Sequence, residues 1–402
     1  MNLMEEETRR GPLHVKPMIE DIRNDRKRQN LHWESFTELY IKEIKKAKVI
    51  VDVGAEWGFY TCLAVKYAPP DCKIFAFEPD PVRFPLVEAL FENNKQVNVY
   101  PMAAADKKGT LTLNKPGIGK SATADPLITR YPGVEGVPFQ VETVTMNDCF
   151  PEIAIDVIKM DIEGAEVLAF QAMERILEKR STVIFLEMHP ISVEAIKKDG
   201  CRFMEDTLKK YGYAVYDGNN RLTSLYSGRV VLRPASGVPP RVRLRPEDAL
   251  READVFYRIG RLTESEKGLR KLIKRKNITA EHLFKSCFLL GEIAGRNRKN
   301  NGEHYYIKAL AMLLHRAGKS ALDAYRIASV YQRLSRFRLA EKWFRRVEEH
   351  SDPGKLLPGA CIHLGEIARA EKKYKEAREW YQKAIRLVPD HTGAVRALEE
   401  LK

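Results

Sequence analysis

The 402-residue chain is poor in cysteine, and its few cysteines are far apart. No CxxC pair and no short cluster of cysteine and histidine occurs among them: Cys62, Cys72, Cys149, Cys201, Cys287 and Cys361. This spacing excludes a zinc-finger site and a disulfide framework. The sequence also lacks a run of about 18 apolar residues, and residues 1–30 are charged, without an apolar segment. We therefore expect a reduced, cytoplasmic protein with no signal peptide and no membrane contact.

The net charge of +13 is concentrated in the C-terminal part. Residues 1–240 hold 32 Lys and Arg against 34 Asp and Glu, a net of −2, whereas residues 241–402 hold 36 against 21, a net of +15. A change of charge at one point in a chain indicates a domain boundary. Prolines and glycines cluster at the same place. We predict four parts: an N-terminal arm and helix at 1–47, an α/β domain at 48–234, a proline-rich linker at 235–245 and helical repeats at 246–402.

Short apolar runs alternate with amphipathic stretches in the α/β part. The expected strands are Val49–Val53, Ile74–Phe77, Val97–Met102, Ile155–Met160, Val183–Leu186, Ala214–Tyr216 and Val230–Leu232, and the expected helices are 57–68, 81–94, 164–179 and 193–210. Such alternation predicts a doubly wound parallel sheet with helices on both faces. The last two runs have no helix between them and should form an antiparallel hairpin.

The C-terminal part repeats at intervals of 37, 38 and 37 residues. Small residues recur at Ser265, Gly302, Ala340 and Ala377, and large apolar residues follow four positions later at Leu269, Tyr306, Phe344 and Tyr381. This period predicts an all-α solenoid of paired helices. The unit from Pro358 to Pro389 resembles a tetratricopeptide repeat most closely. Aromatic residues in this part fall on core positions, so the basic charge fits a solvated surface more simply than a nucleic-acid site.

A glycine-bearing turn follows the first expected strand. Asp52 precedes Gly54 and Gly58, and a helix comes next. Glycines allow sharp turns and close approach of a ligand, and a helix start offers unpaired N–H groups. Asp52 would repel a pyrophosphate but attract a sulfonium and ammonium group. The alternative is a tight turn without a ligand.

Further acidic residues end the later strands. Glu78 lies 24 residues after Gly54, a spacing that suits binding of two ribose hydroxyls. Asp161 and Glu163 end another strand, and Glu187 and His189 follow the next one. Because ligands of open α/β sheets bind at the carboxyl ends of the strands, these side chains should face one cleft. Helix capping for the acidic residues and a structural pair for His189 are the alternatives.

These motifs, in this order, resemble the FkbM family of S-adenosylmethionine-dependent methyltransferases over residues 45–235. The matching strings are Asp52-Val53-Gly54-Ala55, Gly58-Phe59-Tyr60-Thr61, Phe77-Glu78-Pro79, Ala103-Ala104-Ala105-Asp106, Val141–Thr145, Lys159-Met160-Asp161-Ile162-Glu163-Gly164-Ala165-Glu166 and Glu187-Met188-His189-Pro190. The resemblance implies a class I (Rossmann-like) methyltransferase fold and methylation of hydroxyl oxygens. In one departure, Glu56 stands where the family usually has asparagine.

The resemblance also implies roles for individual residues. The residues that would bind S-adenosylmethionine are Asp52, Gly54, Ala55, Gly58, Tyr60, Glu78, Ala104, Asp106, Asp161 and Glu163. The catalytic candidates are Asp161, His189 and Glu187, with Asp161 or His189 as the base that receives the hydroxyl proton. No metal is expected to be required, although Asp161, Glu163 and Glu187 together could hold a divalent cation.

The sequence therefore predicts an O-methyltransferase acting on a sugar, another glycan or a natural-product-like small molecule, with a protein partner docked on the repeats. One alternative is an RNA methyltransferase that holds nucleic acid with the basic repeats. The absence of an Asn/Asp-Pro-Pro-aromatic string gives no support for methylation of base amines. The other alternative, suggested by Glu56, is a catalytically degenerate scaffold.

Overall fold

The computed structural model describes residues 35–115, 121–124, 137–237, 243–297, 302–314, 320–350, 356–389 and 391–401. The chain divides into two compact units, with the division between Val255 and Phe256. Most of the N-terminal arm expected at 1–47 lies outside the described residues. Within the described ranges, no helix combines the length and apolar character needed to cross a membrane.

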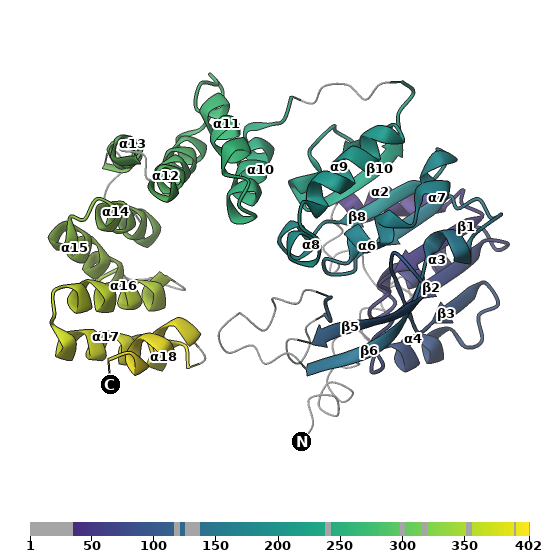
Figure 1. The fold of residues 1–402 in the computed structure, drawn as a ribbon, viewed down its shortest axis with the longest axis horizontal. Coiled ribbons are helices and arrows are strands. Elements are labelled where there is room, and N and C mark those ends of the chain that lie inside the picture. Colours follow the sequence, from purple (N-terminus) through teal and green to yellow (C-terminus); the bar gives the residue numbers. More distant parts are fainter. Residues whose placement is uncertain are drawn as a thin grey trace. The chain divides into compact units, whose positions relative to one another are not determined.

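The first unit contains a seven-stranded sheet in the order β3-β2-β1-β7-β8-β10-β9 (Figure 1). Its strands are β1 (Val49–Val53), β2 (Lys73–Phe77), β3 (Val97–Tyr100), β7 (Val157–Met160), β8 (Val183–Glu187), β9 (Tyr213–Tyr216) and β10 (Arg229–Pro234). Only β10 pairs antiparallel with its neighbours in this sheet, β8 and β9. The predicted parallel sheet and its terminal hairpin are thus confirmed.

Helices cover both faces of this sheet, as expected for a doubly wound fold. One face carries α2 (Ser35–Ile44), α3 (Phe59–Tyr67) and α4 (Phe84–Phe91), whose apolar side chains join one core. The other helices are α5 (Met146–Cys149), α6 (Glu166–Gln171), α7 (Glu174–Glu178), α8 (Pro190–Ile196) and α9 (Gly200–Lys210). On the first face, Tyr40 packs edge-on against Phe185 at 5.2 Å between ring centroids. On the opposite face, Phe150 packs against Phe75 at 5.1 Å.

A second, three-stranded sheet was not expected from the sequence. It consists of β4 (Met102–Ala104), β6 (Val137–Val144) and β5 (Gly109–Lys115), in that order. The predicted run Val97–Met102 is therefore divided, because β3 ends at Tyr100 in the large sheet and β4 begins at Met102 in the small one. Leu113 and Val141 form a small core with Ala103. The small sheet supplies one wall of the pocket described below.

The second unit is a series of antiparallel helix pairs, as the repeat period predicts. Its helices are α11 (Leu262–Leu272), α12 (Ala280–Arg296), α13 (Gly302–Leu314), α14 (Ala321–Arg333), α15 (Phe337–Glu348), α16 (Leu356–Ala370), α17 (Tyr374–Leu387) and α18 (Thr392–Glu399). In two of these pairs, a tyrosine ring of the second helix packs directly against a glycine of the first. A Cβ on Gly365 would lie 2.5 Å from the ring of Tyr381, and a Cβ on Gly291 would lie 2.6 Å from the ring of Tyr306. The repeat motif therefore serves packing.

Helix α10 (Pro246–Arg258) contains the division between the units. Its first turns contact the loop between β9 and β10: Arg245, just before the helix, pairs with Asp217 at 3.3 Å, and Glu252 accepts a hydrogen bond from Ser224 at 2.7 Å. The sequence places the start of the repeats at residue 246, whereas residues up to Val255 pack with the α/β unit.

Candidate functional site

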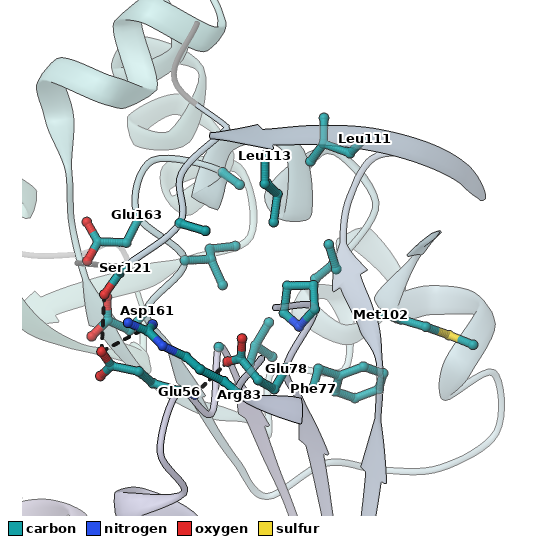
Figure 2. A pocket seen from close by; sticks show the side chains of 18 residues that line it. Glu56, Phe77, Glu78, Arg83, Met102, Leu111, Leu113, Ser121, Asp161 and Glu163 are labelled. Atoms are coloured by element: carbon teal, nitrogen blue, oxygen red, sulfur yellow. Dashed lines mark hydrogen bonds and ion pairs between the residues drawn. The ribbon is translucent and has the colours of Figure 1, made fainter. Parts of the chain in front are cut away.

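One pocket lies at the carboxyl ends of β1, β2 and β7 and extends under the small sheet. Its empty space, including the part that is open to solvent, is about 700 Å³. The lining residues are Val53, Gly54, Glu56, Phe77, Glu78, Pro79, Arg83, Met102, Ala103, Ala104, Leu111, Leu113, Ser121, Ala122, Asp161, Ile162, Glu163 and Ala165. Figure 2 shows that carboxylates gather at one end and apolar side chains at the other.

The apolar end is formed by the second sheet and the end of β2. Leu111 and Leu113 project from β5 toward the space above Glu78, and Met102 and Phe77 lie on the other side (Figure 2). Because alternate residues of a strand share one face, β5 presents both leucines to the pocket. These walls suit a flat, apolar ring.

Glu78 is a buried carboxylate of the pocket lining, beside Phe77 (Figure 2), with 5% of its surface exposed. Its two carboxylate oxygens accept backbone hydrogen bonds, from Glu56 N at 2.6 Å and from Asp80 N at 3.0 Å. These bonds fix the side chain on the turn after β2 and leave further lone pairs toward the pocket. Burial raises the pKa of Glu78 to about 8, although the two hydrogen bonds and the nearby Arg83 oppose this rise.

Glu56 lies at the rim and adopts a left-handed backbone conformation, with φ of 53°. Asparagine tolerates this region better than glutamate does. The carboxylate of Glu56 is 3.3 Å from Arg83 Nη1, and Ser121 donates a hydrogen bond to it at 3.2 Å. Arg83 also lies over the Trp57 ring, 5.0 Å from its centroid. The extra negative charge is therefore balanced within the pocket wall.

Gly54 allows the turn after β1 to lie directly against the turn after β7. Its φ is +80°, and a Cβ there would overlap the backbone oxygen of Asp161. Gly58 is also left-handed and precedes α3, where a Cβ would press on Phe91 at 3.2 Å. Both glycines thus shape the protein at the pocket edge, and Gly54 also lines the pocket itself.

A carboxylate–histidine cluster, consisting of Asp161, Glu163, Glu166, Glu187 and His189, forms at the ends of β7 and β8. His189 Nδ1 is 2.8 Å from Glu166 Oε1, and His189 Nε2 is 3.4 Å from Glu163 Oε2 and 4.0 Å from Asp161 Oδ1. Burial alone would lower the pKa of His189, but the hydrogen bond and charge of Glu166, with the charges of Glu163 and Asp161, raise it to about 9.

Two cations contact this cluster from the sheet. Lys159 Nζ is 3.3 Å from Asp161 Oδ2, and Arg229 Nε is 2.8 Å from Glu187 Oε2. Burial opposes ionisation of Asp161, but Lys159 and His189 outweigh it, so the pKa of Asp161 is lowered. The side chain of Glu187 lies beside that of Asp161. The three predicted catalytic residues therefore lie together, although Asp161 alone among them lines the pocket.

Several predicted cofactor-binding residues lie outside the pocket lining. Asp52 is buried on the α3 side of the sheet and accepts a hydrogen bond from Thr61 Oγ1 at 2.6 Å. Tyr60 packs beside Tyr40, with 5.0 Å between the ring centroids, while Ala55 is buried and Asp106 is exposed. The residues that do line it are Gly54, Glu78, Ala104, Asp161 and Glu163.

Sequence reasoning missed several residues of the site. Glu166 and Lys159 were named only as parts of a motif, without a role in the site. Arg83 and Ser121 both contact Glu56, but both are far from it in the sequence. Only the folded structure shows that they belong to the site. The alternation of Leu111 and Leu113 with polar residues was the signal that could have found β5.

The sheet order, the helices on both faces and the pocket at the strand ends define the α/β unit as a class I methyltransferase fold. Residues 52–215 match the methyltransferase FkbM domain, and residues 358–391 match a tetratricopeptide repeat. The chain therefore contains an FkbM methyltransferase domain followed by a helical region with a tetratricopeptide repeat.

Solved structures with similar folds include both kinds of domain. A methyltransferase FkbM from Methylobacillus flagellatus KT is 11% identical, with a TM-score of 0.32; the match covers 58% of this chain and 62% of that one. A tetratricopeptide repeat protein of Thermus thermophilus is 18% identical, with a TM-score of 0.32, over 39% of this chain and 81% of that one. YrrB, a repeat protein with an unusual peptide-binding site, is 17% identical, with a TM-score of 0.30, over 38% and 74%. No curated protein matches the sequence.

Proposed function

We propose that the α/β unit transfers a methyl group from S-adenosylmethionine to a hydroxyl oxygen of a sugar-like or natural-product-like acceptor. The observation that carries this proposal is the two-ended pocket. Glu78 and the leucines of β5 lie at one end, and Asp161 and Glu163 lie at the other. An apolar slot beside a carboxylate suits a nucleoside, and an acidic end suits a cation.

The residues present fit this cofactor. Glu78 would accept hydrogen bonds from the ribose hydroxyls, since its backbone bonds hold it in place at the pocket wall. Leu111 and Leu113 would cover the adenine, with Ala104 at the back. When bound, the cofactor supplies an electrophilic methyl group on a positively charged sulfur.

The residues of the chain would then orient the acceptor. Asp161 lines the pocket and is fixed by Lys159, so it is the group best placed to accept a hydrogen bond from the acceptor hydroxyl and to receive its proton. His189 lies 4.0 Å from Asp161, and Glu187 lies beside it. The main catalytic contribution is alignment of the oxygen with the methyl carbon.

Glu56 was the feature that favoured a scaffold without cofactor binding. Arg83 balances its charge, and Ser121 hydrogen-bonds it, so Glu56 belongs to the pocket wall. This arrangement supports a binding-competent pocket. We therefore prefer the enzyme over the degenerate scaffold.

Calorimetric titration of the full chain with S-adenosylmethionine tests the proposal. Glu78→Ala should weaken binding by about 1–3 kcal/mol, because the ribose loses its hydrogen-bond acceptor. Glu88→Ala, a change of an exposed glutamate on α4, is the matched control and should leave affinity unchanged. If the unaltered chain does not bind the cofactor, the proposal is wrong. Mass spectrometry of extracts treated with labelled cofactor would then identify the acceptor.

We also propose that the helical unit docks a protein partner with an acidic surface. The support is the tetratricopeptide repeat at 358–391 together with the net charge of +15 over residues 241–402. Cross-linking of the full chain in cell extract at several salt concentrations should capture one acidic protein, with yield falling as salt rises. Filter binding to RNA over the same salt series tests the alternative partner; RNA capture in place of a protein would overturn the proposal.

A further inference from the structure

We propose that Asp161 Oδ1, Glu163 Oε2 and His189 Nε2 form a divalent-cation site at the acidic end of the pocket. One donor atom from each residue lies within 4.8 Å of the others. His189 Nε2 is 3.4 Å from Glu163 Oε2 and 4.0 Å from Asp161 Oδ1. A cation about 2.1 Å from each of its ligands places neighbouring ligand atoms roughly 3–4 Å apart, so a small adjustment brings all three donors onto one ion.

The second observation is Glu166, which lies behind His189. It is completely buried, its Oε1 is 2.8 Å from His189 Nδ1, and its Oε2 has no hydrogen-bond partner among the described residues. A carboxylate on the far nitrogen of a histidine fixes the ring so that its other nitrogen can bind a metal.

The two cations beside the cluster, Lys159 and Arg229, do not contact the three proposed ligand atoms. Lys159 lies against Asp161 Oδ2, so it does not take Oδ1. Glu187 is bound to Arg229, which keeps it beside the site as a support. Asp161 and Glu163 line the pocket, so an ion between them would face its interior. Three protein ligands leave coordination positions open for water or an acceptor.

The donor set indicates which ion binds. One imidazole with two carboxylates suits Mn²⁺, Fe²⁺, Co²⁺ or Zn²⁺ better than Ca²⁺, which prefers more oxygen ligands. This arrangement differs from the cation set considered from the sequence, because His189 takes the place of Glu187. The sequence places all four side chains at one cleft, and the packing of the β7 and β8 ends shows that His189 lies against both carboxylates.

The open positions also indicate the class of acceptor, an inference that rests on the proposed methyl transfer. A cation facing the pocket would bind two adjacent oxygens, such as those of a vicinal diol, and lower the pKa of the bound hydroxyl. We therefore expect acceptors with neighbouring hydroxyl groups. Acceptors with one isolated hydroxyl would lack the second bond to the ion.

The test is a titration of the chelator-treated full chain with Mn²⁺ by calorimetry and with Co²⁺ by absorption spectroscopy. We expect one ion per chain, loss of binding in His189→Ala, and affinity lowered by about 10–100-fold in Glu166→Gln. Glu163→Gln gives a second ligand variant if His189→Ala fails to fold, as judged by circular dichroism. Glu88→Gln is the control and should bind like the unaltered chain.

Two results would overturn the cation site: no binding at millimolar Mn²⁺, or the same affinity in the folded Glu163→Gln and His189→Ala variants. Catechol, used as a vicinal-diol probe, should shift the Co²⁺ spectrum; an unshifted spectrum would overturn the acceptor class. A parallel titration of the metal-free chain with S-adenosylmethionine separates the two ideas. Cofactor binding without metal binding rejects only the cation site, and the reverse rejects only the proposed methyl transfer.

Discussion

Arg83 Nη1 lies 3.3 Å from the carboxylate of Glu56, and this pair joins the turn after β1 to the start of α4. The arginine side chain is almost completely buried, whereas that of Glu56 is about half exposed. The positive charge of Arg83 offsets the charge that Glu56 adds to a pocket with several other carboxylates. Its strength can be measured separately from the roles of either residue in binding.

A double-mutant cycle with Glu56→Gln and Arg83→Met should give a coupling energy of about 0.5–1 kcal/mol in urea denaturation, because Glu56 is partly solvated. Arg83→Met alone should cost about 2–4 kcal/mol, since the buried Arg83 also neighbours Asp80. Additive effects of the two changes would show that the ion pair contributes nothing to stability.

Stability should depend on pH through Glu78. The pKa of Glu78 is about 8 in the folded chain against 4.5 as its ordinary value, so between these values the folded state holds a proton that the unfolded state has released. The contribution of Glu78 to stability is therefore full below about pH 4.5 and falls as pH rises toward 8. Glu78→Gln cannot titrate, so its stability relative to the unaltered chain should rise by on the order of 2–4 kcal/mol between pH 5 and pH 8. A constant difference across this range, measured by urea denaturation, would contradict the raised pKa.

Gly54→Ala should cost about 3 kcal/mol or more and abolish cofactor binding, because the added Cβ would overlap the backbone oxygen of Asp161. Gly260→Ala is the matched control. Gly260 has a φ of +81°, close to the +80° of Gly54, but no atom lies within 4 Å of an added Cβ. Its cost should be only that of the backbone conformation, about 1–2 kcal/mol. Equal melting temperatures for the two variants would show that the contact with Asp161 is unimportant.

In the helical unit, Gly365→Ala and Gly295→Ala should act in opposite directions. An alanine at 365 would press on the ring of Tyr381 and destabilise the chain by about 1–3 kcal/mol. Position 295 lies in α12 with open space around it, so alanine there should stabilise the helix by about 0.5–1 kcal/mol. Thermal unfolding of the full chain gives both values. Stabilisation by both alanines would mean that Gly365 has no packing role.

The strands of the large sheet could be predicted because most of them are short runs of mainly apolar residues, as in β1, β7 and β8, whose central residues are buried. The small sheet could not be read in the same way. Most residues of strand β5 are exposed or half-buried and only two of them are leucines, so its signal is weak. Pro101 also separates β3 from β4 within one apolar run, and a run alone does not show that its two halves join different sheets.

The site was predictable where a residue ends a strand. Gly54, Glu78 and Asp161 follow parallel strands, and such strand ends meet at one edge of a sheet. Arg83 and Glu166 were not assigned roles, because their partners come from distant parts of the chain. Asp52 precedes the glycine turn but points to the α3 side, where Thr61 satisfies it. The sequence motif therefore predicts that a residue lies at a strand end. Only the folded structure shows which way its side chain points.

The contacts of Arg245 and Glu252 with the β9–β10 loop have a practical consequence for dissecting the protein. Arg251 also donates a hydrogen bond to the backbone oxygen of Ser227, within the same loop. A fragment cut at the proline-rich stretch would lose all three contacts beside Arg229, the partner of Glu187. A fragment that preserves the β9–β10 loop should therefore extend at least to Val255 and include the first turns of α10.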